Sequence, residues 1–139
     1  MTSGTAFRFR LERVRAVRER KEKLAQQELA KAMSRRSSTA AELRHAEDLL
    51  AHAHLELRGA AAESGTTSAA DLLARQAFLE RVEAQRGLRA HELEGCEAAV
   101  ADRDAELTTA AAEHDRDAER RERNQLDEIA AARHGRSAA

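Results

Sequence analysis

The sequence predicts an all-α protein in which two long helices pair as an antiparallel coiled coil, with the chain folded back on itself as an α-hairpin. Three observations predict this fold: a composition dominated by helix formers, one cluster of turn residues near the midpoint, and a seven-residue repeat in each half. Ala, Glu, Lys, Leu and Arg supply 89 of the 139 residues, and the chain has no proline. Such a composition with seven-residue periodicity is typical of coiled coils.

Large apolar residues are scarce in this chain. Of the 58 hydrophobic residues 32 are alanine, and Leu, Ile, Val and Phe together number only 23. A compact enzyme core needs more bulky apolar material than this. We therefore expect one elongated domain over residues 1–139, whose core is the seam between the two helices.

A first helix is predicted over about residues 6–62. Its apolar residues follow two series with seven-residue spacing, as a supercoiled seam requires. One series is Leu29, Leu43, Leu50 and Leu57, interrupted by Arg36, and the other, four residues earlier each time, is Ala25, Ala32, Thr39, Ala46 and Ala53. The small side chains of the second series let the partner helix approach closely.

A turn is predicted at residues 63–67, inside the only internal cluster of Ser, Gly and Thr. Ser68 followed by Asp71 resembles a capping box, so a second helix is predicted over about 68–133, with a loose tail at 134–139. Its seven-residue series is Leu72, Leu79, Leu93, Val100 and Leu107, interrupted by Arg86, and Val82, Cys96 and Ala110 each follow a leucine by three residues. Each seam arginine is placed opposite a leucine of the other helix.

The fold-back also predicts how the two chain ends meet. Leu11 and Val14 come opposite residues 115–118, so the second helix extends about ten residues beyond the first. Leu126 and Ile129 share one face of that free end. A monomeric hairpin and a four-helix dimer of hairpins satisfy the same repeat.

Charge is unevenly distributed along the chain. Residues 8–36 carry a net charge of +7, residues 37–119 carry −10 and residues 120–139 carry +2, for a total of −1. In a folded-back chain both basic segments meet at the end that holds the termini. We expect this end to be steered toward an acidic recess of a partner.

The sequence contains no motif for catalysis or cofactor binding. GxxxxGK[ST], GxGxxG and GxSxG are absent, so we expect neither an enzyme nor a binder of a small-molecule substrate or cofactor. His45, His52 and His54 lack converging ligands from other helices, so no metal site is predicted. Cys96 is expected to be a small seam residue. No secretion signal or membrane span is recognised, so a cytosolic protein is expected.

Two terminal segments resemble a known protein family. Residues 7–14, FRFRLERV, are similar to the F-x-F-x-L-x-x-V start of the flagellar FliJ family, which a basic stretch follows. Residues 120–133, RRERNQLDEIAAAR, resemble that family's R-R-E-x-K-x-L-D-E-x-A ending, and residues 77–82, AFLERV, resemble its Y-L-E-R-L step after the turn. The chain departs from the family over residues 100–119, which are rich in Asp and Ala.

The resemblance implies a component of the flagellar type III protein-export apparatus, with a hairpin similar to the central-stalk coiled coil of rotary ATPases. It implies three partners: the hexameric export ATPase, the export gate in the membrane, and export chaperones. It also implies a cytoplasmic protein that associates peripherally with the cell membrane at the flagellar base. The partner-binding residues it suggests are Phe7, Phe9, Leu11, Val14, Arg18, Arg121, Gln125, Leu126, Asp127 and Ile129.

Other interpretations fit parts of the pattern. Residues 8–23 followed by heptads resemble a basic zipper, but they contain no asparagine to contact a base edge. The chain is also predicted to reverse instead of pairing in parallel, so nucleic acid is not the expected partner. A generic coiled-coil adaptor fits the same repeat. The N-terminal arginines, together with Phe7, Phe9, Leu11, Val14 and Val17, also fit a helix that lies on anionic lipid.

Overall fold

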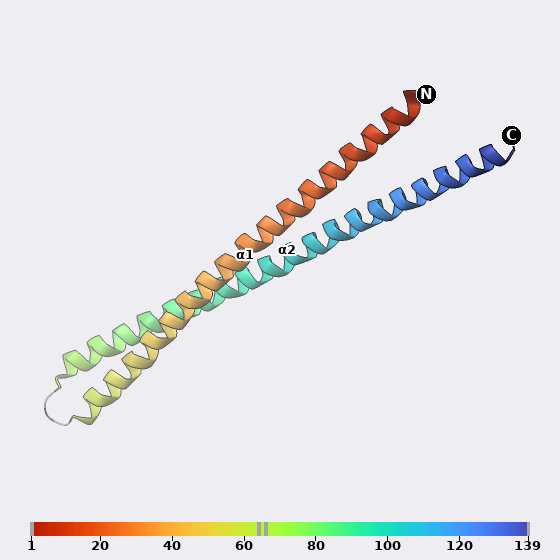
Figure 1. Cartoon of the computed structure of the whole chain (residues 1–139). Helices are drawn as coiled ribbons and strands as arrows, with labels where there is room; N and C mark the ends of the chain where they lie inside the picture. The colour runs from red at the N-terminus through yellow and green to blue at the C-terminus, as the bar shows by residue number, and fades with distance from the viewer. Residues whose placement is uncertain (1, 64, 66, 139) are drawn as a thin grey trace. The chain divides into compact units, whose positions relative to one another are not determined.

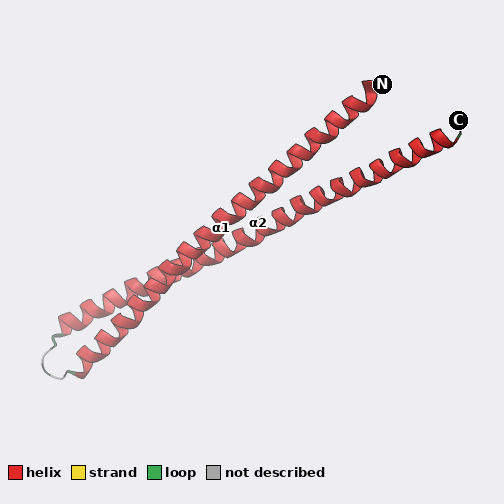
Figure 2. Ribbon diagram, in the orientation of Figure 1, coloured by secondary structure: helices red, strands yellow, loops and turns green. Residues whose placement is uncertain are grey.

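The computed structural model describes residues 2–63, 65 and 67–138, with side chains from residue 4 onward. These residues form two long helices, α1 (Thr2–Ala62) and α2 (Ala69–Ser137), which pack together (Figures 1 and 2). No strand occurs in the described ranges, and the predicted all-α class is confirmed. α1 begins earlier than predicted and α2 continues into the expected tail, because no proline interrupts either helix.

The connection between the helices is closed by local hydrogen bonds at the end of α1. Glu63 N donates to the Gly59 carbonyl oxygen at 3.2 Å, and the Thr67 hydroxyl donates to the Ala60 carbonyl oxygen at 3.2 Å. Both bonds satisfy carbonyl groups that the last helical turn leaves without a partner. Gly65 has a φ of 105°, a conformation that glycine adopts without steric cost.

Helix α2 begins with the predicted cap. The backbone N–H of Asp71 donates to Ser68 Oγ at 3.2 Å, so the serine hydroxyl satisfies one of the free amides of the first turn. Two residues of the predicted turn, Ser64 and Thr66, lie outside the described residues.

The chain divides into two compact units. The loop unit is Lys31–Ala101, and the terminal unit combines Met1–Ala30 with Asp102–Ala139. Each unit therefore contains one segment of α1 and one segment of α2. The single domain predicted over residues 1–139 stays a prediction.

In the loop unit the predicted alanine series is buried. Val82 is 4% exposed, and it is the only large side chain among the buried residues of the described part. The other buried residues share one seven-residue series of α1 and are Ala32, Ala46, Ala53 and Ala60. The helices of this unit therefore pack through small side chains, and the leucines of the neighbouring series lie half-buried beside them.

Polar contacts fix how the two helices pair in the loop unit. Thr39 Oγ1 lies 3.6 Å from Cys96 Sγ, so the lone cysteine faces the seam as predicted. Arg89 Nη1 lies 3.1 Å from Glu42 Oε2 and 2.9 Å from Glu92 Oε2. The pKa of Arg89 is raised above its ordinary value, chiefly by the hydrogen bond to Glu92 and then by the charge of Glu42.

One predicted arginine contact also has structural support in the loop unit. Arg36 and Leu93 line the same shallow groove, together with Met33 and Leu43. The exposed guanidinium of Arg36 can therefore remain in water while its methylene groups cover apolar surface.

The first testable prediction concerns the buried valine. Replacing Val82 by alanine removes two methyl groups from the seam, and we expect the free energy of unfolding to fall by about 1–2 kcal/mol. The higher helix propensity of alanine offsets a smaller part of this loss. Urea unfolding followed by circular dichroism measures the change.

The matched control is the same substitution at Val17, whose side chain is 54% exposed. Val17→Ala keeps the propensity gain and loses little burial, so its effect should stay within about 0.5 kcal/mol. Equal effects of the two substitutions would show that Val82 does not stabilise the seam.

Candidate functional site

The seam of the terminal unit changes from apolar to ionisable residues toward the chain ends. Both seven-residue series of α1 continue toward the N-terminus, where they reach Arg18 and Glu22. The series of α2 continue past Leu107 and Ala110 in the same way. They reach His114, Asp117 and Arg121, all of which are half-buried.

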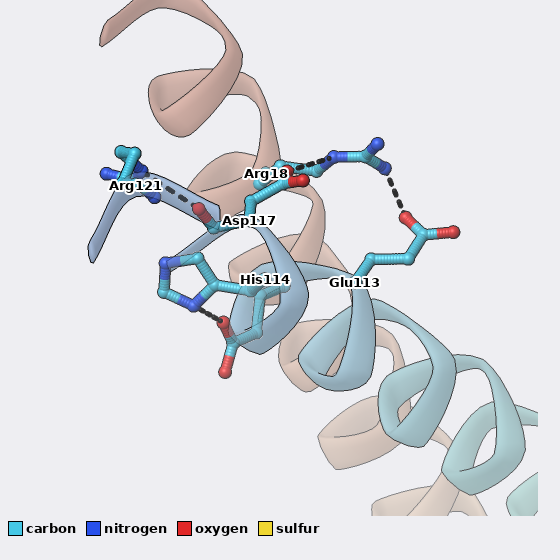
Figure 3. Close-up of polar contacts among 6 residues, drawn as sticks. Arg18, Glu113, His114, Asp117 and Arg121 are labelled. Atoms are coloured by element: carbon cyan, nitrogen blue, oxygen red, sulfur yellow. Dashed lines mark hydrogen bonds and ion pairs between the residues drawn. The ribbon is translucent and has the colours of Figure 1, made fainter. Parts of the chain in front are cut away.

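Arg18 lies between two carboxylates of α2 (Figure 3). Its Nε donates to Asp117 Oδ2 at 3.0 Å, and its Nη1 donates to the Glu113 carboxylate. The three side chains are 31%, 18% and 34% exposed for Arg18, Asp117 and Glu113. Glu113 and Asp117 are four residues apart on one helix and repel each other, and the single positive charge of the shared guanidinium offsets part of this repulsion.

A second polar contact lies on the same stretch of the seam. His114 Nδ1 lies 3.0 Å from Glu22 Oε2, and these side chains are 29% and 26% exposed. We call Arg18, Glu22, Glu113, His114 and Asp117 the ionic layer. It connects segments of α1 and α2 that are almost one hundred residues apart in sequence, as the separation of 99 between Arg18 and Asp117 shows.

Side-chain packing in the terminal unit ends close to the ionic layer. Leu11 is half-buried, whereas residues 4–10 and 122–138 are exposed throughout. Arg121 is held by its own helix, because its Nε donates to the Asp117 carbonyl oxygen at 3.3 Å (Figure 3). The two helix ends therefore offer their side chains to solvent on all sides.

Most of the residues suggested as partner-binding are exposed. Phe7 is 52%, Phe9 is 64%, Leu126 is 65% and Ile129 is 52% exposed. Val14, Gln125 and Asp127 are also exposed, and Leu11 faces the seam. The guanidinium of Arg13 lies 5.8 Å from the centroid of the Phe9 ring. Arg18 differs from this group, because its guanidinium is already engaged by Glu113 and Asp117.

The register in the terminal unit differs from the prediction by about one helical turn. Arg18 contacts Glu113 and Asp117, so Leu11, one repeat earlier, comes opposite residues 120–124 instead of 115–118. When the same alignment of the two helices is continued toward the chain ends, Leu126 comes opposite Phe7. The sequence prediction had placed Leu126 beyond the end of the first helix. The same offset occurs in the loop unit, where Thr39 contacts Cys96 and Glu42 contacts Arg89. The sequence prediction aligned the leucines alone.

The sequence pattern did not predict the ionic layer as a set. Glu22, Glu113, His114 and Asp117 were not recognised, although three of them follow the leucine and alanine series at seven-residue steps. Extending each series beyond its last apolar member would have found them. Among residues 2–63, 65 and 67–138, no group of three or more His, Cys, Asp or Glu residues is arranged to hold a metal ion.

No helix in the described ranges combines the length and the apolarity needed to cross a membrane. No buried side-chain nitrogen or oxygen in these ranges lacks a hydrogen-bond partner.

The second prediction tests the ionic layer. Arg18→Ala leaves Glu113 and Asp117 close together without a counter-charge, and we expect the free energy of unfolding to fall by about 1–2 kcal/mol. Amide hydrogen exchange should accelerate in the terminal unit more than in the loop unit. Arg15→Ala is the control, because Arg15 is 57% exposed and pairs only with Glu19.

The control substitution should cost about 0.5 kcal/mol or less, since exposed pairs four residues apart contribute little. An Arg18→Ala protein as stable as the Arg15→Ala protein would contradict a stabilising role for the layer. A double-mutant cycle between Arg18 and Asp117 separates their interaction from the effect of either residue alone.

The chain matches no protein-family model, no curated protein sequence and no solved structure.

Proposed function

We propose that the whole chain forms a two-helix antiparallel coiled coil. The support comes from contacts inside each unit, where later residues of α1 contact earlier residues of α2. In the loop unit Thr39 contacts Cys96 and Glu42 contacts Arg89, and in the terminal unit Arg18 contacts Asp117. An α-hairpin that continues through both units requires this sense of pairing.

We propose that this protein is a flagellar export component similar to the FliJ family. In this role it binds the ring of the export ATPase and the membrane export gate, and it helps to deliver chaperone-bound cargo. The observation that carries the proposal is the exposed apolar set of the terminal unit: Phe7, Phe9, Leu126 and Ile129. The resemblance of residues 7–14 and 120–133 to the family's terminal motifs includes all four residues.

The ionic layer gives this docking surface its geometry. Arg18 with its two carboxylates, and His114 with Glu22, join the two helix segments just before side-chain packing ends. The exposed apolar residues of both ends are therefore carried on segments whose pairing is fixed nearby. Burial of each such side chain in a partner contributes at most about 1.5–3 kcal/mol, before the cost of ordering is subtracted.

The remaining suggested residues have supporting roles in this proposal. Gln125 and Asp127 flank Leu126 and offer polar contacts at the rim of the apolar surface, as interfaces commonly do. Arg18 positions the two helices in place of contacting the partner, and Arg121 is bonded to its own helix. The proposed location is the cytoplasmic side of the cell membrane at the flagellar base, where the protein is held by its protein partners.

The third prediction tests the docking surface with Leu126→Asp combined with Ile129→Asp. Both positions are exposed, so helix content should stay unchanged. The charges disrupt apolar burial, and we expect stimulation of the export ATPase from the same organism to be lost, with binding weakened by about 100-fold or more. ATP hydrolysis and direct binding of the purified proteins are the measurements.

The control is Leu55→Asp combined with Leu88→Asp in the loop unit. These leucines are each 65% exposed, like Leu126, so the control adds the same charge to surfaces of similar exposure. The control protein should stimulate the ATPase as the wild type does. Unchanged stimulation by the Leu126 and Ile129 variant, or an equal loss in both variants, would reject the proposed docking surface.

A nucleic-acid-binding function is the alternative that uses the same N-terminal arginines. The ion pair between Arg18 and Asp117 argues against it, because it pairs the basic segment with the other end of the chain and not with a parallel copy of itself. Retardation of DNA by the purified protein without any binding to the ATPase would favour this alternative.

A further inference from the structure

Over residues 7–24, one side of α1 combines basic and apolar residues, and the first acidic residue on that side is Glu28, beyond its inner end. Consecutive members are three residues or one residue apart, so they lie on one side of the helix. We call this set the basic-apolar stripe, and its members are Phe7, Arg10, Arg13, Val14, Val17, Arg20, Lys21 and Leu24. The acidic residues within residues 7–24, Glu12, Glu19 and Glu22, lie on other sides of the helix.

The stripe is open to solvent along its whole length. Phe7 is 52%, Val14 is 46%, Val17 is 54% and Leu24 is 59% exposed. The α2 segment packs against a different side of α1, where Leu11, Arg18 and Ala25 are half-buried. From Phe7 to Leu24 the stripe extends about 26 Å at 1.5 Å per residue. At its inner end Lys21 and Leu24 border a shallow groove that Glu106 and Glu113 line from α2.

We propose that the basic-apolar stripe binds the surface of an anionic lipid membrane, with α1 lying parallel to the surface. The apolar side chains enter the boundary between headgroups and acyl chains, and the four basic side chains reach the phosphate groups. Arginine and lysine suit this position, because their methylene stems lie along apolar surface while their charged ends stay hydrated. This inference goes beyond the proposed function, which places the protein at the membrane through protein partners.

Charge complementarity and shape favour lipid over other acidic partners. A protein groove that encloses an amphipathic helix contacts most of its circumference, but the seam side of this segment is occupied by α2 and its far side carries Glu12 and Glu19. A planar surface needs only the one open side. Nucleic acid would engage the basic residues but would leave Val17 and Leu24 without a function, and the stripe holds no asparagine or glutamine to contact base edges.

The fourth prediction uses co-sedimentation of the full-length protein with vesicles. We expect binding to vesicles that contain phosphatidylglycerol and none to vesicles of phosphatidylcholine alone. Arg13→Glu combined with Arg20→Glu should weaken the binding by about 25-fold or more, since each basic residue near an anionic surface contributes a factor of about five. Val17→Ser combined with Leu24→Ser should also weaken it, because apolar insertion is lost.

The matched control is Arg8→Glu combined with Arg15→Glu. These arginines are likewise seven residues apart and exposed, and the change in net charge is identical, but they lie on the opposite side of the helix. The control should lose less than about fivefold in binding, since its charges face away from the lipid. Circular dichroism should show unchanged helix content for all variants.

Three outcomes would overturn the proposal: no binding of the wild type to phosphatidylglycerol vesicles, equal losses for the two arginine pairs, or full binding by the Val17 and Leu24 variant. Binding of the stripe to DNA or to an acidic protein in place of vesicles also overturns it. The Leu126 and Ile129 variant should bind vesicles as the wild type does, so failure of the ATPase docking surface and failure of the lipid proposal give different results.

Discussion

Close approach of two helices through alanine is the constraint on which this structure depends. Ala46 and Ala53 in the loop unit are nearly inaccessible to solvent, and no large side chain of the described residues is completely buried. Each alanine removes little apolar surface from water, about 0.8 kcal/mol for a methyl-sized group. Stability therefore has to come from many repeats of a weak contact, which explains why the helices are long and why the composition favours helix formers so strongly.

A seam of this kind has small side chains inside and leaves most of the large ones outside. Large side chains such as Leu55, Leu73 and Leu88 lie on the outer surfaces of the helices and are each about two-thirds exposed. Exposed apolar residues and arginines also lie close together along the helix segments near the chain ends. Both proposals for the terminal unit follow from this geometry, and Phe7 belongs to both surfaces.

The ionic layer contributes to the selectivity of helix alignment, whereas the alanine seam contributes to stability. Charged groups that are two-thirds removed from water lose hydration, so such pairs contribute less stability than apolar contacts of similar size. They are selective, however, because Arg18 reaches both of its carboxylates only when the helices are aligned in one register. Polar residues in otherwise apolar seams are known to specify alignment in this way.

The fold was predictable from the sequence because its signals are local and repeated. The serine cap of α2, the inward alanine series and the seam position of Cys96 each followed from spacing within a single helix. The ionic layer was not predictable in the same way. A charged residue in an apolar series resembles an interruption, and only the partner across the seam shows that Arg18 and Asp117 belong together. The register error had the same origin.

The exposure of the suggested docking residues was easier to anticipate, because the residues seven positions before and after Leu126 and Ile129 are all charged. Arg18 was harder to interpret. In the sequence Arg18 cannot be distinguished from Arg15 and Arg20. Its side chain is half-buried because it contacts residues that are almost one hundred positions away. Sequence periodicity locates a seam residue, but it does not give the identity of the group that faces it.

The half-exposed ion pairs of the ionic layer have a consequence for the solution behaviour of the protein. Dissolved salt screens charges beyond about 8 Å at physiological ionic strength and closer than that in concentrated brine. Apolar contacts between alanines are strengthened by excluded salts such as sulfate. The two units should therefore respond in opposite directions as ionic strength rises, with the ends of the chain loosening while the region around the loop tightens.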